Sequence, residues 1–264
     1  MPQLIIIGSG IKSLAHLTQE VLVIIKQSEK VLYLLNEPYL KEWIERESKI
    51  SESLEPIYFA QEKRIDNYKA ITNYIVEEYK KHSSLCFISY GHPTIYDMPA
   101  ITAAREINEQ GGNAIILPAI SSMDCLFADL VIDPSDSGCY SADATDFLIY
   151  SRPFDPRSHL ILLQVGAIAT YNQETTHHVH VLRDYLLKYY EKEHRVCYYE
   201  AALYPQQKPR MDFFPLSMMA EQPVNGLTTL YIPPINKATQ CNMEMLKLLN
   251  MEIDNFLETP KVNS

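Results

Sequence analysis

Short apolar runs alternate with longer amphipathic segments along most of the chain. The run at 4–7 ends at Gly8-Ser9-Gly10, and the run at 31–34 follows a segment that starts after Thr18. Short apolar runs are typical of buried strands. A helix is indicated where apolar residues recur every three or four positions after a capping residue such as Thr. The alternation of the two patterns predicts an α/β fold.

The central stretch of this pattern is Ser89-Tyr90-Gly91-His92-Pro93. It lies between an apolar run at 85–88 and a helical pattern at 101–110. In open α/β sheets, ligands bind at the carboxyl ends of strands, where helix N-termini and free backbone N–H groups collect. Glycine allows a ligand to approach the backbone, and proline stiffens the exit. The stretch is therefore a candidate ligand loop, although a plain strand-to-helix connection has the same pattern.

The rest of the chain continues the alternation as far as residue 232. Prolines at 205, 209, 215 and 223 interrupt regular structure late in the chain. Apolar residues then recur at helical spacing after Ala238, a pattern typical of a packing or dimerisation helix; they are Met243, Leu246, Leu249, Ile253 and Phe256. We expect further helices at 37–47, 121–130 and 175–193, and one that follows the segment 57–68 and carries Ile71, Tyr74, Ile75 and Tyr79. Further strands are expected at 114–117, 159–166, 195–201 and 227–232.

Composition limits the classes of function. A chain of 264 residues with 47% hydrophobic content is long enough for two medium domains. The formal charge of −10 argues against a general nucleic-acid-binding surface. Five cysteines without a C-x-x-C pair indicate neither a disulfide framework nor a zinc site. No secretory signal or long apolar run is present, so we expect a soluble, cytoplasmic protein with no membrane partner.

Arg64 and Tyr68 form the first candidate for chemistry. They are four positions apart, so on a helix they share a face. A cation beside a phenol stabilises the phenolate and lowers its pKa from about 10, as a tyrosine base would require. An ordinary cation–π pair at the surface has the same spacing.

Three other motifs carry weaker signals. The Gly8-Ser9-Gly10 turn lacks the third glycine of a dinucleotide fingerprint, because Ser13 stands there. Ser121 and Ser122 begin a predicted helix and direct hydroxyls and N–H groups towards the strand ends, although simple helix capping explains them too. The histidines at 177, 178 and 180 would point to different faces of a helix, so we expect no metal site.

The opening of the chain, from the first strand through G-S-G-I to the second strand, resembles the tetrapyrrole methylase superfamily. One branch is more similar still, the borosin peptide-backbone α-N-methyltransferases. That resemblance rests on Tyr58, Arg64, Tyr68, the Tyr90-Gly91-His92-Pro93 loop, and the D-C-L-F-A-D-L-x-I-D-P run at 124–134. Ordinary tetrapyrrole methylases have a Gly-Asp-Pro type loop where this chain has Gly91-His92-Pro93. The resemblance covers about residues 1–235.

The resemblance implies two α/β domains with an S-adenosylmethionine site in the cleft between them. The domains would be 1–118 and 119–235, followed by a C-terminal helix and tail at 236–264. Tyr68 would be the base, with its phenolate favoured by Arg64, and Tyr58 and Tyr90 would hydrogen-bond the oxygen of the reacting amide. The residues implied for donor binding are Gly91, His92, Ile95, Ser121, Ser122, Gln164, Leu203 and Thr229.

The resemblance also implies partners. Fused borosins carry their substrate peptide at their own C-terminus, whereas this sequence ends at Ser264 without an apolar core peptide. We therefore expect iterative methylation of a separate precursor peptide by a homodimer, in a heterotetramer with two precursor chains. The alternatives are a precorrin-type C-methyltransferase and a non-catalytic donor-binding regulatory module. A ribosomal RNA ribose methyltransferase is disfavoured by the acidic charge.

Overall fold

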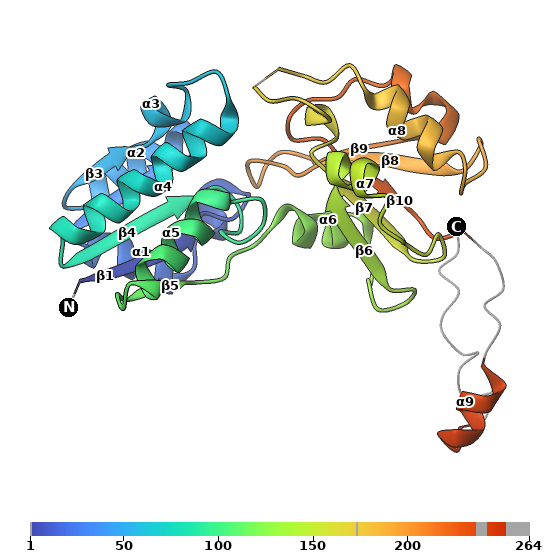
Figure 1. The fold of residues 1–264 in the computed structure, drawn as a ribbon, viewed down its shortest axis with the longest axis horizontal. Helices are drawn as coiled ribbons and strands as arrows, with labels where there is room; N and C mark the ends of the chain where they lie inside the picture. The colour runs from blue at the N-terminus through green and yellow to red at the C-terminus, as the bar shows by residue number, and fades with distance from the viewer. Residues whose placement is uncertain (1, 173, 236–241, 252–264) are drawn as a thin grey trace.

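The computed structural model describes residues 2–172, 174–235 and 242–251, and it contains two five-stranded sheets (Figure 1). The first sheet has the order β3-β2-β4-β1-β5, and all its described pairings are parallel. Its strands are β1 (Gln3–Gly8), β2 (Lys30–Leu34), β3 (Ser51–Ser53), β4 (Ser84–Ser89) and β5 (Ala114–Ile116).

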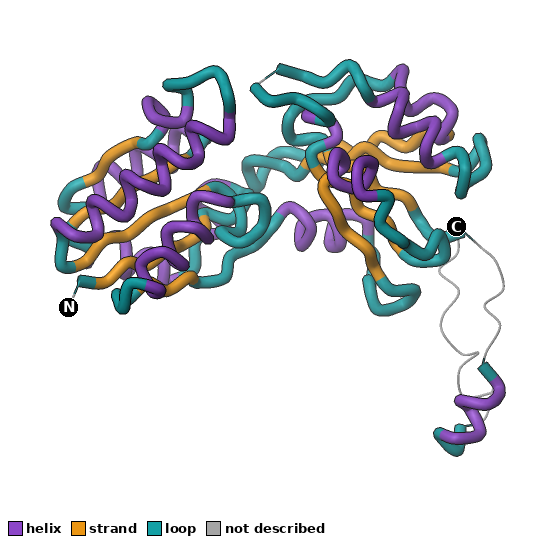
Figure 2. The backbone as a smooth tube through the Cα atoms, in the orientation of Figure 1, coloured by secondary structure: helices purple, strands orange, loops and turns teal. Residues whose placement is uncertain are grey.

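Helices cover both faces of this parallel sheet (Figure 2). Val21 and Ile44 pack with Ile7 and Ile88 on one face, and Ile71 and Ala103 pack on the other. Burial on both faces explains why the strands consist almost entirely of apolar residues. The elements on the two faces are α1 (Gln19–Gln27) and α2 (Pro38–Glu47), then α3 (Glu55–Tyr58), α4 (Arg64–Lys81) and α5 (Met98–Glu109); a short 3-10 helix, η1 (Ser13–His16), follows β1.

The second sheet is mixed, with the order β6-β7-β10-β8-β9. Only β6 and β7 pair in parallel; the other described pairings are antiparallel. The strands are β6 (Cys139–Asp143), β7 (His159–Leu163), β8 (Arg195–Glu200), β9 (Arg210–Pro215) and β10 (Thr229–Ile232). Around them lie α6 (Ser122–Leu130), α7 (Ala144–Tyr150), α8 (Val179–Leu186), η2 (Val165–Ala167) and η3 (Leu216–Glu221), and α9 (Met243–Leu248) follows.

The predicted α/β architecture is confirmed. Leu126 of α6 packs with Ile161 and Cys197 of the second sheet, so the chain passes from one sheet to the other between β5 and α6. The domain boundary at 118 stays a prediction. No described helix is long and apolar enough to cross a membrane.

Some predicted elements were wrong or missed. The helix predicted at 175–193 is reduced to α8, because Thr176 is buried and held in a turn. Its N–H donates to the Gly166 carbonyl at 2.8 Å and its hydroxyl to the Ile168 carbonyl at 2.6 Å. Strands β6 and β9 and helix α7 were not predicted. Of the predicted C-terminal helix, the structure describes α9, and Ile253 and Phe256 lie outside the described residues.

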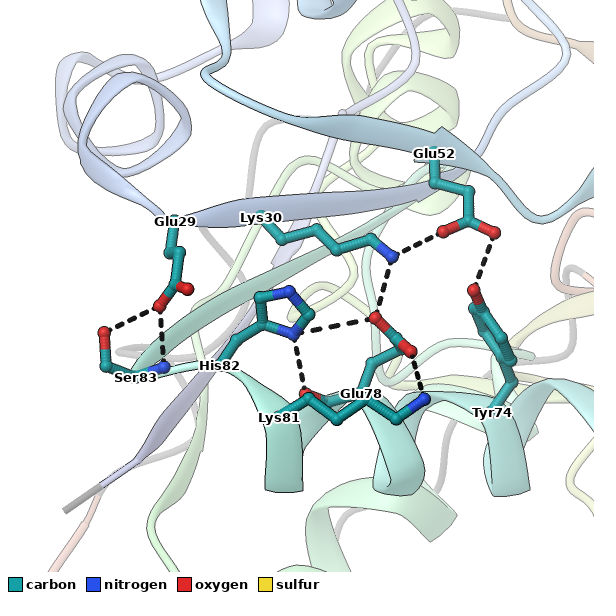
Figure 3. Close-up of polar contacts among 8 residues, drawn as sticks. All are labelled: Glu29, Lys30, Glu52, Tyr74, Glu78, Lys81, His82 and Ser83. Atoms are coloured by element: carbon teal, nitrogen blue, oxygen red, sulfur yellow. Dashed lines mark hydrogen bonds and ion pairs between the residues drawn. The ribbon is translucent and has the colours of Figure 1, made fainter.

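Helix α4 is anchored at its C-terminal half by a cluster of charged side chains (Figure 3). The Lys30 ammonium lies 2.7 Å from the Glu78 carboxylate and 2.5 Å from the Glu52 carboxylate. Lys81 contacts the same Glu78 at 2.8 Å, and the Tyr74 hydroxyl donates to Glu52 at 2.6 Å. The side chains of Lys30 and Glu78 are only 12% and 5% exposed. The cluster therefore holds α4 against β2 and β3.

Lys30→Met should lower the free energy of unfolding by about 2–3 kcal/mol at pH 7, because it leaves a buried carboxylate with one partner fewer. The matched variant Lys26→Met removes a lysine that is 53% exposed from its pair with Glu47 and should cost less than about 1 kcal/mol. Chemical denaturation measures both values.

The same comparison should depend on pH. Burial acts to raise the pKa of Glu52 and of Glu78, but hydrogen bonds from Lys30, Tyr74 and Lys81 outweigh it and lower both pKa values. A depressed carboxyl pKa gives stability that is present above the ordinary pKa and is lost as pH falls through the folded value. The difference between wild type and Lys30→Met should therefore shrink below about pH 4. If the difference in free energy of unfolding between wild type and Lys30→Met did not change with pH, the carboxylates of the cluster would not be responsible for it.

Candidate active site

A cavity of about 490 Å³ is lined by residues from both the first and the second sheet. Leu34 and Ser89, at the carboxyl ends of β2 and β4, line one side, and Leu163 and Thr229 of the second sheet line the other. The volume is in the usual range for a small-molecule site. All predicted site residues except Leu203 line this cavity: Tyr58, Arg64, Tyr68, Tyr90, Gly91, His92, Ile95, Ser121, Ser122, Gln164 and Thr229.

Two glycine loops meet backbone to backbone beside the cavity. Gly91 has a φ of +74° and exchanges two hydrogen bonds of 3.1 Å with Gly10, whose φ is +65°. A Cβ atom on Gly8 would lie 2.1 Å from the Gly91 carbonyl oxygen, so only glycine permits this approach. His92 follows, and its Nδ1 accepts from the Thr94 N–H at 3.2 Å. This bond orients the His92 imidazole through Nδ1 and does not involve its Nε2 atom.

The N-terminus of α6 forms another part of the wall. The Ser121 hydroxyl accepts from the Asp124 N–H at 3.2 Å, and the Asp124 carboxylate accepts from the Ser121 N–H at 2.6 Å. This reciprocal capping box explains why the helix begins here. The simple capping role that the sequence left open is present for Ser121, and the residue lines the cavity as well.

Tyr58, Arg64 and Tyr68 gather at the junction of α3 and α4. Arg64 is the first residue of α4, Tyr68 lies one turn later, and the Tyr58 and Tyr68 ring centroids are 6.0 Å apart. The backbone N–H of Arg64 donates to the Tyr171 carbonyl at 2.9 Å, and its guanidinium donates to the Asn172 carbonyl. Because Tyr171 and Asn172 belong to the half of the chain that builds the second sheet, the start of α4 is fixed to both halves.

The phenols of Tyr68 and Tyr90 are neutral at rest. Burial raises the pKa of Tyr68, Tyr58 adds to the increase, and the charge of Arg64 lowers it without outweighing burial. The net shift is opposite to the one that the sequence predicted, because spacing does not show how deeply the ring is buried. Burial also raises the pKa of Tyr90 to about 12. Both residues can therefore donate hydrogen bonds, and Tyr68 could accept a proton only after losing its own.

Sequence reasoning missed Asp97, which caps α5 and lines the same cavity. Its carboxylate accepts from the Ala100 N–H at 3.1 Å, and burial raises the pKa of its carboxyl although Ser89 acts to lower it. A second cavity of about 460 Å³ shares Arg64, Tyr68 and Asp97 with the first. Asp97-Met98-Pro99 has the pattern of a helix start, which predicts the cap but not the cavity.

The described residues contain no group of three or more His, Cys, Asp or Glu side chains placed to hold a metal ion. His177, His178 and His180 precede or begin α8, and the ring centroids of His178 and His180 are 6.4 Å apart. The titratable groups around the cavity are phenols, carboxylates, a guanidinium and one imidazole, which suit proton transfer and hydrogen bonding.

Comparison with known proteins shows which family this chain belongs to. Residues 3–211 match the family model of the tetrapyrrole (corrin/porphyrin) methylases. The methyltransferase and type I borosin cyclic peptide precursor of Coprinopsis marcescibilis is 31% identical over 261 residues, which are 94% of this chain and 67% of that protein. The chain belongs to the tetrapyrrole methylases, in their borosin branch. It is therefore an S-adenosylmethionine-dependent methyltransferase.

Two further relatives, each a methyltransferase and a cyclic peptide precursor, support the same family. The methyltransferase and dendrothelin A precursor of Dendrothele bispora is 35% identical, with 98% of this chain and 63% of that protein covered. The methyltransferase and omphalotin A precursor of Omphalotus olearius is 34% identical, with 94% and 61% covered. This chain thus spans 61% to 67% of the length of these three relatives.

Solved structures support the methylase fold. The uroporphyrin-III C-methyltransferase of Thermus thermophilus aligns with a TM-score of 0.63 at 16% identity, covering 88% of this chain and 92% of that one. The methyltransferase CobJ aligns with a TM-score of 0.61 at 14% identity, covering 91% and 98%. A second structure of the Thermus enzyme, with a TM-score of 0.60 at 14% identity and 88% and 92% covered, is a complex with S-adenosyl homocysteine.

Gly91→Val should strongly weaken binding of the methyl donor. A Cβ at Gly91 would meet only the Ile11 side chain, at 3.5 Å, so the valine would project into the cavity. We expect the donor dissociation constant to rise roughly tenfold or more, the equivalent of about 1.4 kcal/mol of lost contact. Calorimetry with S-adenosylmethionine measures it.

Gly111→Val is the matched control. Gly111 has a φ of +78°, with no atom within 4 Å of an added Cβ, and lies outside the cavity. Both variants impose similar backbone strain, of about 1–3 kcal/mol. Equal stability losses with donor binding reduced only in Gly91→Val would place the donor at the glycine loops. Unchanged affinity in a folded Gly91→Val protein would remove it from there.

Proposed function

We propose that this protein methylates backbone amide nitrogens of a peptide, iteratively, with S-adenosylmethionine as the donor. The observation that carries the proposal is the meeting of two groups of residues in one cavity: the glycine and serine loops at Gly91 and Ser121, and the phenols of Tyr58, Tyr68 and Tyr90. The first group suits a nucleotide-like donor. The second suits an acceptor that must lose a proton and hold negative charge on oxygen.

The residues fit the donor in size and chemistry. The cavity volume accommodates a small molecule, and Gly91 leaves the backbone open to close approach. We assign donor binding to Gly91, His92, Ile95, Ser121, Ser122, Gln164 and Thr229. Leu203 stays a weaker candidate because it does not line the cavity. When bound, the donor supplies an already activated methyl group.

The acceptor chemistry falls to the tyrosines. An amide nitrogen is a poor nucleophile because its lone pair is delocalised into the carbonyl. In our proposal the Tyr68 phenolate takes the N–H proton, and the Tyr58 and Tyr90 hydroxyls donate to the carbonyl oxygen as negative charge builds there. Arg64 opposes the effect of burial on Tyr68 and so makes its ionisation less costly. Burial of the site excludes water from the reacting atoms.

The relatives support a peptide as the acceptor. Their names describe single proteins that are both a methyltransferase and the precursor of a ribosomally synthesised cyclic peptide. For the present chain we propose a precursor supplied as a separate chain, a homodimer, and a complex of two subunits with two precursors. The exposed apolar side chains Met243 and Leu249 at α9 favour a covered interface.

Tyr68→Phe should nearly abolish methylation while folding and donor binding survive, because it removes only a hydroxyl. The loss expected for a positioned base is about a hundred- to ten-thousandfold in rate. The assay is mass spectrometry of a precursor peptide co-expressed from a neighbouring small open reading frame, with fragmentation to locate each methyl group. Methylation of a precorrin-type substrate in place of the peptide would favour the C-methyltransferase alternative.

Tyr79→Phe is the control for this variant. Tyr79 lies on the same helix, and its hydroxyl bonds to the Pro2 carbonyl and the Asn113 N–H away from the cavity. It should methylate at the wild-type rate. If Tyr68→Phe methylated the peptide as fast as Tyr79→Phe with both substrates saturating, Tyr68 would not be the base. His92 would then be the next residue to test.

The pH profile tests the ionisation directly. Because the pKa of Tyr68 is raised above its ordinary value of about 10, the phenolate fraction should grow about tenfold per pH unit throughout pH 7–9. The maximal rate should follow that slope without a plateau. Arg64→Lys should lie below wild type and recover partly at higher pH, since it keeps a charge but loses the planar guanidinium. A plateau below pH 8 would point to a different titrating group.

A further inference from the structure

Glu37 lies buried between the two halves of the cleft, although sequence patterns mark it only as the start of a helix. The residue is 2% exposed and caps α2. Its carboxylate accepts from the N–H groups of Tyr39 and Leu40 at 2.9 and 2.7 Å, and from the Ser13 hydroxyl at 2.6 Å. These three donors belong to the half of the chain that builds the first sheet.

The fourth donor comes from the other half. The Tyr204 hydroxyl donates to Glu37 Oε1 at 2.8 Å, and Tyr204 follows β8 of the second sheet. The Tyr204 ring also meets the Tyr39 ring edge-on, with centroids 6.0 Å apart and planes at 81°. Burial acts to raise the pKa of Glu37, but the hydrogen bonds outweigh it and lower the pKa. The link is therefore a charge-assisted hydrogen bond at neutral pH.

This link joins two walls of the cavity. Asn36, the neighbour of Glu37, lines one wall, and Ala201, three residues before Tyr204, lines the opposite wall. We infer that Glu37 and Tyr204 are a positioning pair, which sets the separation of the two walls and thereby the affinity for the methyl donor. The inference rests on the proposed assignment of this cavity to the donor. Neither residue lines the cavity, so the pair acts through the segments that it connects.

Tyr204→Phe tests the pair with little risk to the fold. The variant keeps the aromatic contact with Tyr39, and Glu37 keeps three of its four donors. We expect the dissociation constant and KM for S-adenosylmethionine to rise about three- to tenfold, a fraction of the roughly ten- to hundredfold that a hydrogen bond to a charged group is worth. The kcat at saturating donor and the peptide KM should stay close to wild type, and the melting temperature should fall by only about 2–4 °C. A purely structural role would move the melting temperature and leave the donor affinity alone.

The matched control is Tyr74→Phe. Its hydroxyl donates to Glu52 at 2.6 Å, a similar tyrosine–glutamate bond that lies entirely within the first half. It should leave donor affinity unchanged. The inference would be overturned, with the donor assignment intact, if wild type and Tyr204→Phe bound the donor equally well. An equal loss of donor affinity in Tyr204→Phe and Tyr74→Phe would have the same consequence. Absence of donor binding by the wild-type protein would overturn the donor assignment and the inference together.

Discussion

The close approach of two backbone loops is the constraint on which the site depends. The turn after β1 and the turn after β4 are neighbours because their strands are adjacent and parallel. Beyond the strands, Gly10 and Gly91 form an isolated antiparallel bridge that joins the two turns. A side chain at Gly8 would separate them. Without that contact, the residues of the central loop would not face the N-terminus of α6. The parallel sheet thus determines where the cavity forms.

Burial and charge have opposite effects on the pKa of Tyr68. The environment that excludes water from Tyr68 also makes its phenolate costly, and the guanidinium of Arg64 offsets only part of that cost. Arg64 is in turn occupied by carbonyl groups of Tyr171 and Asn172. Arg64 and Tyr68 both stand on α4, but the carbonyl groups that hold the guanidinium belong to the other half of the chain. The position of the charge beside the phenol therefore depends on contacts between the two halves.

Sequence patterns and the family resemblance predicted much of the fold and part of the cavity wall, for identifiable physical reasons. Buried parallel strands such as β4 are continuous apolar runs, and caps such as Thr18 mark helix starts, so these were visible. Strands β6 and β9 lie at the edges of the second sheet, and an exposed edge strand has no apolar run to mark it. Asp97 and the Glu37–Tyr204 bond depend on contacts between distant segments, which local spacing does not contain. To predict the direction of the Tyr68 pKa shift, one must also know how deeply its ring is buried, which the sequence does not show.

Helix α4 has a mechanical consequence for the enzyme. Tyr68 stands in its second turn and Glu78 ten residues later, a separation of about 15 Å along a rigid rod. The charged cluster around Lys30 fixes the far end, while the near end carries Arg64 and Tyr68. The loop at 59–63 before the helix is mostly exposed and lies outside that clamp. A substitution in this loop can therefore alter the cavity wall at Phe59 while the charged cluster keeps α4, and with it Tyr68, in place.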